Sequence, residues 1–327
     1  MMSSDTPTDR LFFREAISRA LREAMREDPH MLLMGQDIGE FGGPYRDFAG
    51  LHAEFGPERV RDTPVAEAST VALAVGCAAA GVRSLVSITY MDFLMMGLDP
   101  LVNYAAKLRF KTAGQLRAPV VVKTTAGANG QGVAHSQALE AWLMGVPGLK
   151  VVAPASPADA YGLLKQALRE EGPVVFMDHK RLFPMAGPVS RTQEFIPFGQ
   201  ARMLRPGRDL TITCHSFMTV PTLAAASALA DKGIEAEVLD LRSLAPLDTA
   251  AIIASIGRTG RLLTVEEGQV TCGVGAEVAF RAREALPTLR VARLGALPVP
   301  ISSNPVLEAA SLPDLARIVA AAQKLFA

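Results

Sequence analysis

The chain has 327 residues, enough for two domains of ordinary size. Its 33 basic and 33 acidic side chains balance, so no net field favours nucleic acid or an anionic membrane as a partner. Apolar runs fall far short of a membrane span, and MMSSDTPTDR lacks the features of a signal peptide, which predicts a cytoplasmic protein. Three widely separated cysteines argue against a disulfide framework.

Predicted helices and strands alternate along the first half of the chain. Residues 1–10 are expected to form a flexible tail, and the 3.6-residue period of 11–28 predicts an amphipathic helix. The apolar segments that follow predict strands within 31–39, 83–90, 118–125, 149–154 and 173–178. Helices are predicted from Glu67 onward and over 92–110, 136–144 and 156–171. The glycine-rich loop 40–50 is expected to line a site or an interface.

The periodic pattern lapses and then begins again in the second half. We place a first domain over 11–185, a linker over 186–207 and a second domain over 208–327. Strands are predicted over 209–214, 236–241, 261–266 and 289–295, and helices over 218–231, 248–256, 273–286 and 310–326. This alternation predicts the α/β class, with two domains that each hold a parallel sheet between two helical layers.

Two ionisable residues stand where an open α/β sheet keeps its ligands, beyond the carboxyl ends of strands. Glu67 follows Asp62-Thr63-Pro64 and is expected in the first turn of a helix, as a proton-transfer group or as a partner of the helix dipole. His135 follows a strand and a loop containing three glycines, at the expected start of another helix, as a site residue or as a cap.

Other motifs carry less weight. Phe93, in YMDFLMM, is either an aromatic platform for a flat ring or a core residue. The segment CGVGAEV (272–278) lacks the third glycine of a dinucleotide fingerprint and predicts a tight turn that opens a helix. The five histidines have no zinc-motif spacing, so no transition-metal site built by this chain is predicted.

Several motifs, in order, resemble one family. They are DTPVAE (62–67), DFLMMGLDPLVNYAAK (92–107), GVAHSQALEAW (132–142), PGLKVVAPASPADAYGLL (147–164), VLDLRSLAPLDTAAI (238–252) and TVEEGQVTCGVGAEV (264–278). They resemble the β subunit of the thiamine-diphosphate-dependent E1 component of 2-oxoacid dehydrogenase complexes, a family that includes pyruvate, branched-chain 2-oxoacid and acetoin enzymes. The resemblance covers nearly the whole chain. It implies a transketolase-like pyrimidine-binding domain followed by a transketolase C-terminal-like domain.

The resemblance also implies roles for individual residues. Glu67 matches the glutamate that hydrogen-bonds the aminopyrimidine ring of thiamine diphosphate and promotes loss of its C2 proton. Phe93 matches the aromatic residue packed on that ring, and Thr89 falls at a neighbouring cofactor-site position that varies with substrate type. His135 matches the histidine that faces the substrate end of the cofactor and is linked to acyl transfer onto the lipoyl group.

The resemblance implies partners as well. No Gly-Asp-Gly motif for the Mg²⁺ of the diphosphate occurs in the sequence, so an E1 α subunit is expected to bind that ion and complete an α2β2 assembly. A lipoyl acyltransferase (E2) core is the expected further partner. The family's K⁺ loop aligns with 167–172 (ALREEG), which lacks the usual Asp, so K⁺ binding stays open.

The sequence departs from the family at KTTAGANGQG (123–132), Ala134 and LGALPVPISSN (294–304). Which 2-oxoacid or acyloin is the substrate therefore stays open. Two alternative functions also remain: a subunit of a split transketolase-type ketol transferase, and a non-catalytic assembly subunit.

Overall fold

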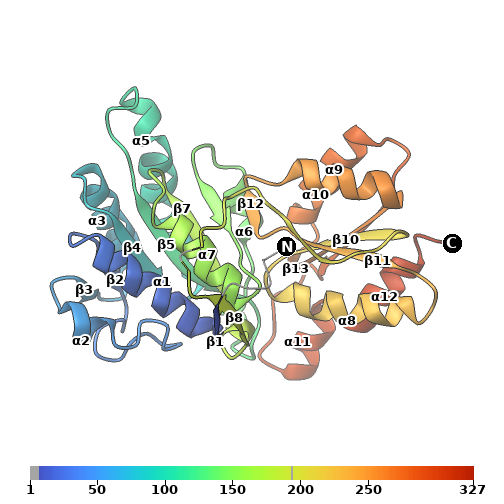
Figure 1. Ribbon diagram of the computed structural model, residues 1–327, viewed down its shortest axis with the longest axis horizontal. Coiled ribbons are helices and arrows are strands. Elements are labelled where there is room, and N and C mark those ends of the chain that lie inside the picture. Colours follow the sequence, from blue (N-terminus) through green and yellow to red (C-terminus); the bar gives the residue numbers. More distant parts are fainter. Residues whose placement is uncertain (1–6, 193) are drawn as a thin grey trace. The chain divides into compact units, whose positions relative to one another are not determined.

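The computed structural model describes residues 7–192 and 194–327, which form two units. The first comprises the chain up to Ala126 together with Leu143–Phe198, and the second comprises Gly127–Trp142 together with Gly199–Ala327. Each unit has a mostly parallel sheet and flanking helices (Figure 1), which confirms the predicted fold class. The segment Gly127–Trp142, which the sequence places within the first domain, packs with the second unit.

Six strands of the first unit pair in parallel and form its main sheet. They run side by side in the order β6 (Lys150–Val152), β7 (Val174–His179), β5 (Val120–Ala126), β4 (Ser84–Ile88), β2 (Leu32–Gly35) and β3 (Val60–Asp62). Strand β5 is buried along its whole length, as expected of an apolar strand between helical layers. The predicted strands of this half are confirmed, and β3 is an additional one.

The helices of the first unit bury the apolar faces that the sequence predicts. Residues Phe13, Ile17 and Leu21 of the first helix are fully buried. Helices α1 and α7 pack together and lie in front of the strands in Figure 1. The helices are α1 (Phe13–Glu27), α2 (Leu51–Phe55), α3 (Glu67–Ala79), α4 (Met91–Leu94), α5 (Ala106–Lys111) and α7 (Pro157–Ala167), while α6 (Glu140–Met144) connects the units.

The predicted continuous helix over 92–110 is wrong in detail. Between α4 and α5 the chain forms a 3-10 turn (Met95–Gly97) and a π-helix (Asp99–Ala105). Pro100 has no N–H, so it cannot continue an α-helical hydrogen-bond ladder. A Cβ on Gly97 would lie 2.9 Å from a methyl carbon of Val71, so only glycine allows this segment to approach α3 so closely.

Part of the predicted flexible tail forms a strand. Strand β1 (Thr8–Phe12) pairs antiparallel with β8 (Ala186–Ser190), which lies in the predicted linker. The prediction for residues 1–6 lies outside the described residues. The two strands are far apart in sequence, so no local pattern reveals their pairing. Another 3-10 turn (Lys180–Leu182) lies between β7 and β8.

The second unit has a sheet with the order β14 (Arg290–Ala296), β13 (Arg261–Gln269), β10 (Leu210–Cys214), β11 (Ala236–Asp240) and β9 (Arg202–Arg205). The first four are parallel and were predicted; β9 is antiparallel and lies within the predicted linker. In Figure 1 the helices α9 (Thr249–Thr259) and α10 (Val274–Ala285) lie above these strands, and α8 (Thr219–Ala230) and α12 (Leu315–Gln323) below.

The predicted terminal helix over 310–326 is two helices. Helix α11 (Pro305–Ser311) ends before Pro313, and α12 begins after Asp314, whose side chain accepts the N–H of Arg317 at 2.8 Å. Proline disfavours a helical conformation in the preceding residue, which explains the break. A short strand β12 (Ser243–Ala245) and a 3-10 turn (Ser216–Met218) complete this unit. No helix among the described residues is long and apolar enough to cross a membrane.

Candidate functional site

Glu67 is the first residue of α3, as predicted, and lies just beyond the carboxyl end of β3. Its side chain is buried, with 5% of its surface exposed. The Nε2 of Gln36, which follows the neighbouring strand β2, donates to Glu67 Oε1 at 3.3 Å. No ion pair to this carboxyl occurs within residues 7–192 and 194–327. A buried carboxyl held by one neutral amide suits a hydrogen bond to a ring nitrogen, so this residue fits the pyrimidine of thiamine diphosphate.

Thr89 and Phe93 lie at the same edge of the sheet as Glu67. Both come after β4, which is parallel to β2 and adjacent to it. They are half-buried, and the Phe93 ring meets the Tyr90 ring edge to face with centroids 6.4 Å apart. The structure therefore brings these three predicted residues to one edge of one sheet, where parallel strands place ligands.

His135 belongs to the second unit. It lies half-buried in a loop in which Gly127, Gly130 and Gly132 have positive φ angles. The Gly127 N–H donates to the Gln137 carbonyl at 3.2 Å and closes this loop. The prediction that His135 opens a helix is wrong, because the closed loop keeps the chain outside any helix until α6 begins at Glu140.

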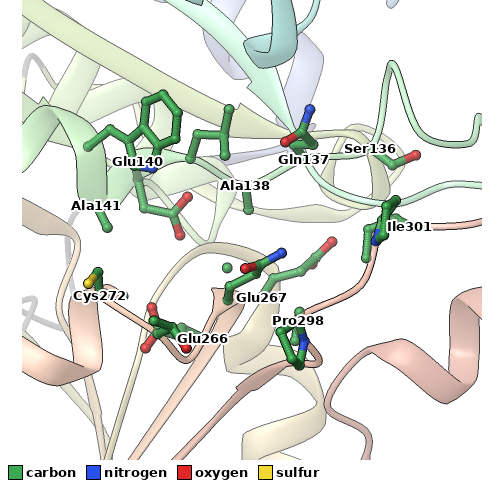
Figure 2. Close-up of a pocket in the computed structure, with 18 of the residues that line it drawn as sticks. Ser136, Gln137, Ala138, Glu140, Ala141, Glu266, Glu267, Cys272, Pro298 and Ile301 are labelled. Carbon is green, nitrogen blue, oxygen red and sulfur yellow. The ribbon is translucent and has the colours of Figure 1, made fainter.

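The second unit contains a cavity of about 470 Å³. Its walls come from the segment that includes α6, from the end of β13 and from the loop after β14; Figure 2 shows residues of all three. At one wall the Nε2 of His215 donates to Glu140 Oε1 at 2.8 Å, and both residues are buried. The sequence did not predict this pair, whose members lie far apart in the chain.

Glu266, near the end of β13, is a third ionisable group beside this cavity. We call Glu140, His215 and Glu266 the cavity cluster. Its carboxyl accepts the backbone N–H groups of Val274 and Gly275 at 2.7 and 2.9 Å, at the start of α10. A Cβ on Gly275 would lie 2.2 Å from Thr264 Oγ1, so glycine at this position lets the start of α10 approach β13 closely. The glycines of CGVGAEV therefore open a helix, as predicted, and the first N–H groups of that helix, from Val274 and Gly275, hold the Glu266 carboxyl.

Glu266 and His215 bind protons more tightly than free side chains do. Burial raises the pKa of Glu266 to about 7, and the charge of Glu140 adds to this effect, although His215 and the two N–H donors lower it. Burial alone lowers the pKa of His215, but the hydrogen bond and the charge of Glu140 outweigh it and raise the net pKa. The sequence offered one signal for this site: Glu266 ends the predicted strand 261–266 and is followed by the two glycines of CGVGAEV.

The free energy of unfolding of the chain should fall as the pH rises from about 4.5 to about 7, because Glu266 and His215 favour their protonated forms in the folded state. Raising the Glu266 pKa from 4.5 to about 7 corresponds to about 3 kcal/mol that is lost as the pH rises between those values. The raised pKa of His215 acts in the same direction, because its stabilisation is present below the unfolded pKa and disappears through the folded pKa. Urea unfolding across this pH range measures the slope.

Glu266→Gln should flatten that pH profile, because it removes one titrating group and one charge that raises the His215 pKa. Glu284→Gln is the matched control, since Glu284 lies exposed at the other end of α10. It should keep the wild-type slope. The same slope in Glu266→Gln and in the wild type would contradict the assignment.

Comparisons with known proteins identify both domains and several relatives. The family model "Transketolase, pyrimidine binding domain" matches residues 10–185, and "Transketolase, C-terminal domain" matches residues 199–318. Pyruvate dehydrogenase E1 component subunit beta-2, mitochondrial, from Oryza sativa is 42% identical over 322 residues, which cover 95% of this chain and 85% of the relative.

Two further proteins extend the comparison. The β subunit of acetoin:2,6-dichlorophenolindophenol oxidoreductase from Cupriavidus necator is 37% identical over 329 residues, covering 96% of this chain and 97% of the relative. A solved structure described as a split-gene transketolase, an inactive β4 tetramer, has a TM-score of 0.81 and 27% sequence identity, and covers 96% of this chain and 97% of its own.

Proposed function

Because this chain belongs to the E1 β-subunit family, with its transketolase pyrimidine-binding and C-terminal domains, we propose that it is the β subunit of a heteromeric E1 enzyme. The enzyme uses thiamine diphosphate to decarboxylate a 2-oxoacid, or to cleave acetoin, and reductively acylates a lipoyl domain. The single observation that carries this proposal is the buried carboxyl of Glu67 at the ligand edge of the first sheet.

Glu67 has the central role among the residues of this chain. Thiamine diphosphate, when bound, supplies the nucleophilic carbon and the electron sink that decarboxylation requires. Glu67 holds a proton at the pyrimidine ring nitrogen, and burial strengthens this hydrogen bond by excluding water. Gln36 positions the carboxyl through its 3.3 Å hydrogen bond. Phe93 supports the flat ring by packing, Thr89 lines the same edge, and His135 serves acyl transfer to the lipoyl group.

An exposed apolar face next to Glu67 supports the proposal that a partner chain binds there. The solvent-facing residues of α3 are small or apolar: Ala68, Ser69, Ala72, Leu73 and Gly76. Met96 and Tyr104, on the segments packed against α3, are 60% and 56% exposed. A helix that is apolar on all sides is normally buried. We propose that the E1 α subunit covers this face, close to the cofactor edge.

The remaining assignments extend the same proposal. The pyrimidine-binding domain spans 11–185 and the C-terminal-like domain spans 208–327, joined by 186–207. In an α2β2 assembly, the α subunit supplies most of the ligands of the Mg²⁺ ion. An E2 core receives the acyl group. K⁺ binding at 167–172 and a cytoplasmic location stay predictions.

Two alternatives differ in partner and reaction. A split transketolase-type subunit is supported by the similarity to the solved transketolase chain, but identities of 37–42% to E1 β subunits favour the E1 function. A non-catalytic assembly subunit would have no use for the buried carboxyl of Glu67, because burying a carboxyl without a charged partner costs stability.

Calorimetric titration of thiamine diphosphate with Mg²⁺ tests the proposal. The chain is titrated alone and then as the complex co-expressed with its E1 α subunit. We expect saturable binding to the complex and none to the chain alone, because this chain supplies the pyrimidine half of the site. The loaded complex is then assayed with a panel of 2-oxoacids and acetoin.

Equally tight binding to the chain alone would contradict the shared site. Transfer of ketol units between sugars, without any requirement for a lipoyl domain, would instead identify the transketolase-type alternative.

A further inference from the structure

Two buried carboxylates bind the backbone of the loop that carries His135. We call residues 127–137 the His135 loop. Oε1 of Glu267, near the end of β13, accepts the Ala128 N–H at 2.7 Å. Oε2 of Glu308, on α11, accepts the Gly130 N–H at 2.7 Å. Glu267 and Glu308 are only 8% and 6% exposed. Because a hydrogen bond to a carboxylate is stronger than one between neutral groups, these two contacts fix the first part of the loop.

Packing holds the same part of the His135 loop. Ala128 is fully buried in a small apolar core whose other members are Ala296, Ile301 and Leu312. Gly132 has a φ of +78°, and a Cβ there would lie 3.2 Å from Ser303 Cβ. Glycine therefore lets the loop lie close to the segment that precedes α11. Residues 128, 130 and 132 thus each contact a group of the second unit that lies outside the loop.

These fixed residues lead directly to His135. The His135 N–H donates to the Gly132 carbonyl at 3.2 Å, so a short turn joins the packed glycine to the histidine. The Gly127 N–H donates to the Gln137 carbonyl and closes the loop from its other end. The tip at 129–131 is exposed and has no regular secondary structure. Such a loop depends on contacts with the rest of the unit to keep a side chain in one place.

We propose that Glu267 and Glu308 are positioning residues, which hold His135 where it serves acyl transfer to the lipoyl group. This inference rests on the function proposed for His135 and assigns that function two further residues. Both act through the loop backbone and not by contact with the cofactor or the lipoyl group. Without either carboxylate the loop can shift, and a misplacement of about 1 Å can lower a rate about 10²-fold.

Amide hydrogen–deuterium exchange tests whether the carboxylates fix the loop, and it needs no enzyme activity. The full chain and its complex with the α subunit are compared by mass spectrometry. In Glu267→Ala and Glu308→Ala, peptides from the His135 loop should exchange about tenfold faster or more, because each variant loses a hydrogen bond to a charged group. Peptides from β10 and β11 should exchange as in the wild type, which shows that the unit is folded.

Glu308→Gln and Asp314→Ala complete this set. Glutamine keeps a side-chain oxygen that can accept the Gly130 N–H, so Glu308→Gln should recover most of the protection. Asp314→Ala is the matched control, because Asp314 also accepts a backbone N–H, that of Arg317 at 2.8 Å, but at the start of α12. It should leave exchange of the His135 loop unchanged.

Assays of the two half-reactions test the consequence for His135. In the complex, Glu267→Ala and Glu308→Ala should lower the rate of reductive acylation of a lipoyl domain about tenfold to a hundredfold. Decarboxylation of the 2-oxoacid, measured with an artificial electron acceptor, should stay near the wild-type rate with an unchanged KM. In a His135→Ala background, Glu308→Ala should cause little further loss, because its effect passes through the histidine. Asp314→Ala should match the wild type in both assays.

Wild-type exchange of the His135 loop in both folded alanine variants would overturn the proposal. Equal losses in the two half-reactions would also overturn it, and so would a full further loss when Glu308→Ala is added to His135→Ala. Each of these results would give the carboxylates a general structural role. A wild-type complex without either half-reaction would instead contradict the proposed function and the role of His135 with it, while the exchange experiment would still show whether the carboxylates fix the loop.

Discussion

Glu67→Gln should lower the rate of C2-proton exchange of bound thiamine diphosphate by about 10²–10⁴-fold in the complex with the α subunit, as expected for loss of a positioned proton-transfer group. Glutamine has nearly the same shape but cannot exchange a proton with the ring nitrogen. The carboxyl is 5% exposed, so water cannot readily replace it. Hydrogen–deuterium exchange, followed by quenching and NMR of the released cofactor, measures the rate.

Glu58→Gln is the matched control, because Glu58 precedes β3 and its side chain is 87% exposed. This variant should exchange at the wild-type rate, and both variants should assemble and bind cofactor. Wild-type exchange in assembled Glu67→Gln would remove Glu67 from the proton-transfer role and leave it as a partner of the helix dipole.

Lys123→Met should lower the free energy of unfolding by about 3–5 kcal/mol, the usual cost of removing one partner from a buried ion pair. Lys123 Nζ lies 2.7 Å from Asp47 Oδ2 and 2.7 Å from Asp178 Oδ2, and all three side chains are buried. Burial alone lowers the pKa of the lysine, but the two carboxylates raise it well above its usual value. Methionine would leave these carboxylates together without a cation.

Urea unfolding measures this loss, and Lys150→Met is the control. Lys150 pairs with Glu170 at a position where its side chain is 37% exposed, so its removal should cost less than about 1 kcal/mol. The triple variant Lys123→Met with Asp47→Asn and Asp178→Asn should recover part of the lost stability, because no buried charge then remains. A loss under about 1 kcal/mol in Lys123→Met would refute the ionic interpretation.

The buried ion pairs of Lys123 also explain how the loop at 40–50 is held against the sheet. Asp47 comes from that loop, Lys123 from β5 and Asp178 from β7. The lysine also lies 5.6 Å from the ring centroids of Phe48 and Phe183. The loop is therefore fixed to the sheet by charge and by packing. The sequence predicted that this loop lines a site or an interface, but nothing local indicated that a lysine from another strand would anchor it.

The sequence by itself determined the α/β class, the predicted parallel strands and the place of Glu67. These features are local: period and length of apolar runs report which face of an element is buried, and Pro64 with the small residues after it marks where α3 begins. The resemblance to the E1 β-subunit family marked Thr89 and Phe93, and the parallel pairing of β2 with β4 in the structure places them at the same edge as Glu67.

Tertiary structure decided the contacts between residues that are distant in the chain. The pairing of β1 with β8, the inclusion of Gly127–Trp142 in the second unit and the contact of Glu140 with His215 each join residues far apart in the chain. The breaks at Pro100 and Pro313 depend on local residues that the helical period concealed. Contacts between distant residues depend on which strands become neighbours, and the pattern along one strand carries no information about its neighbour's side chains.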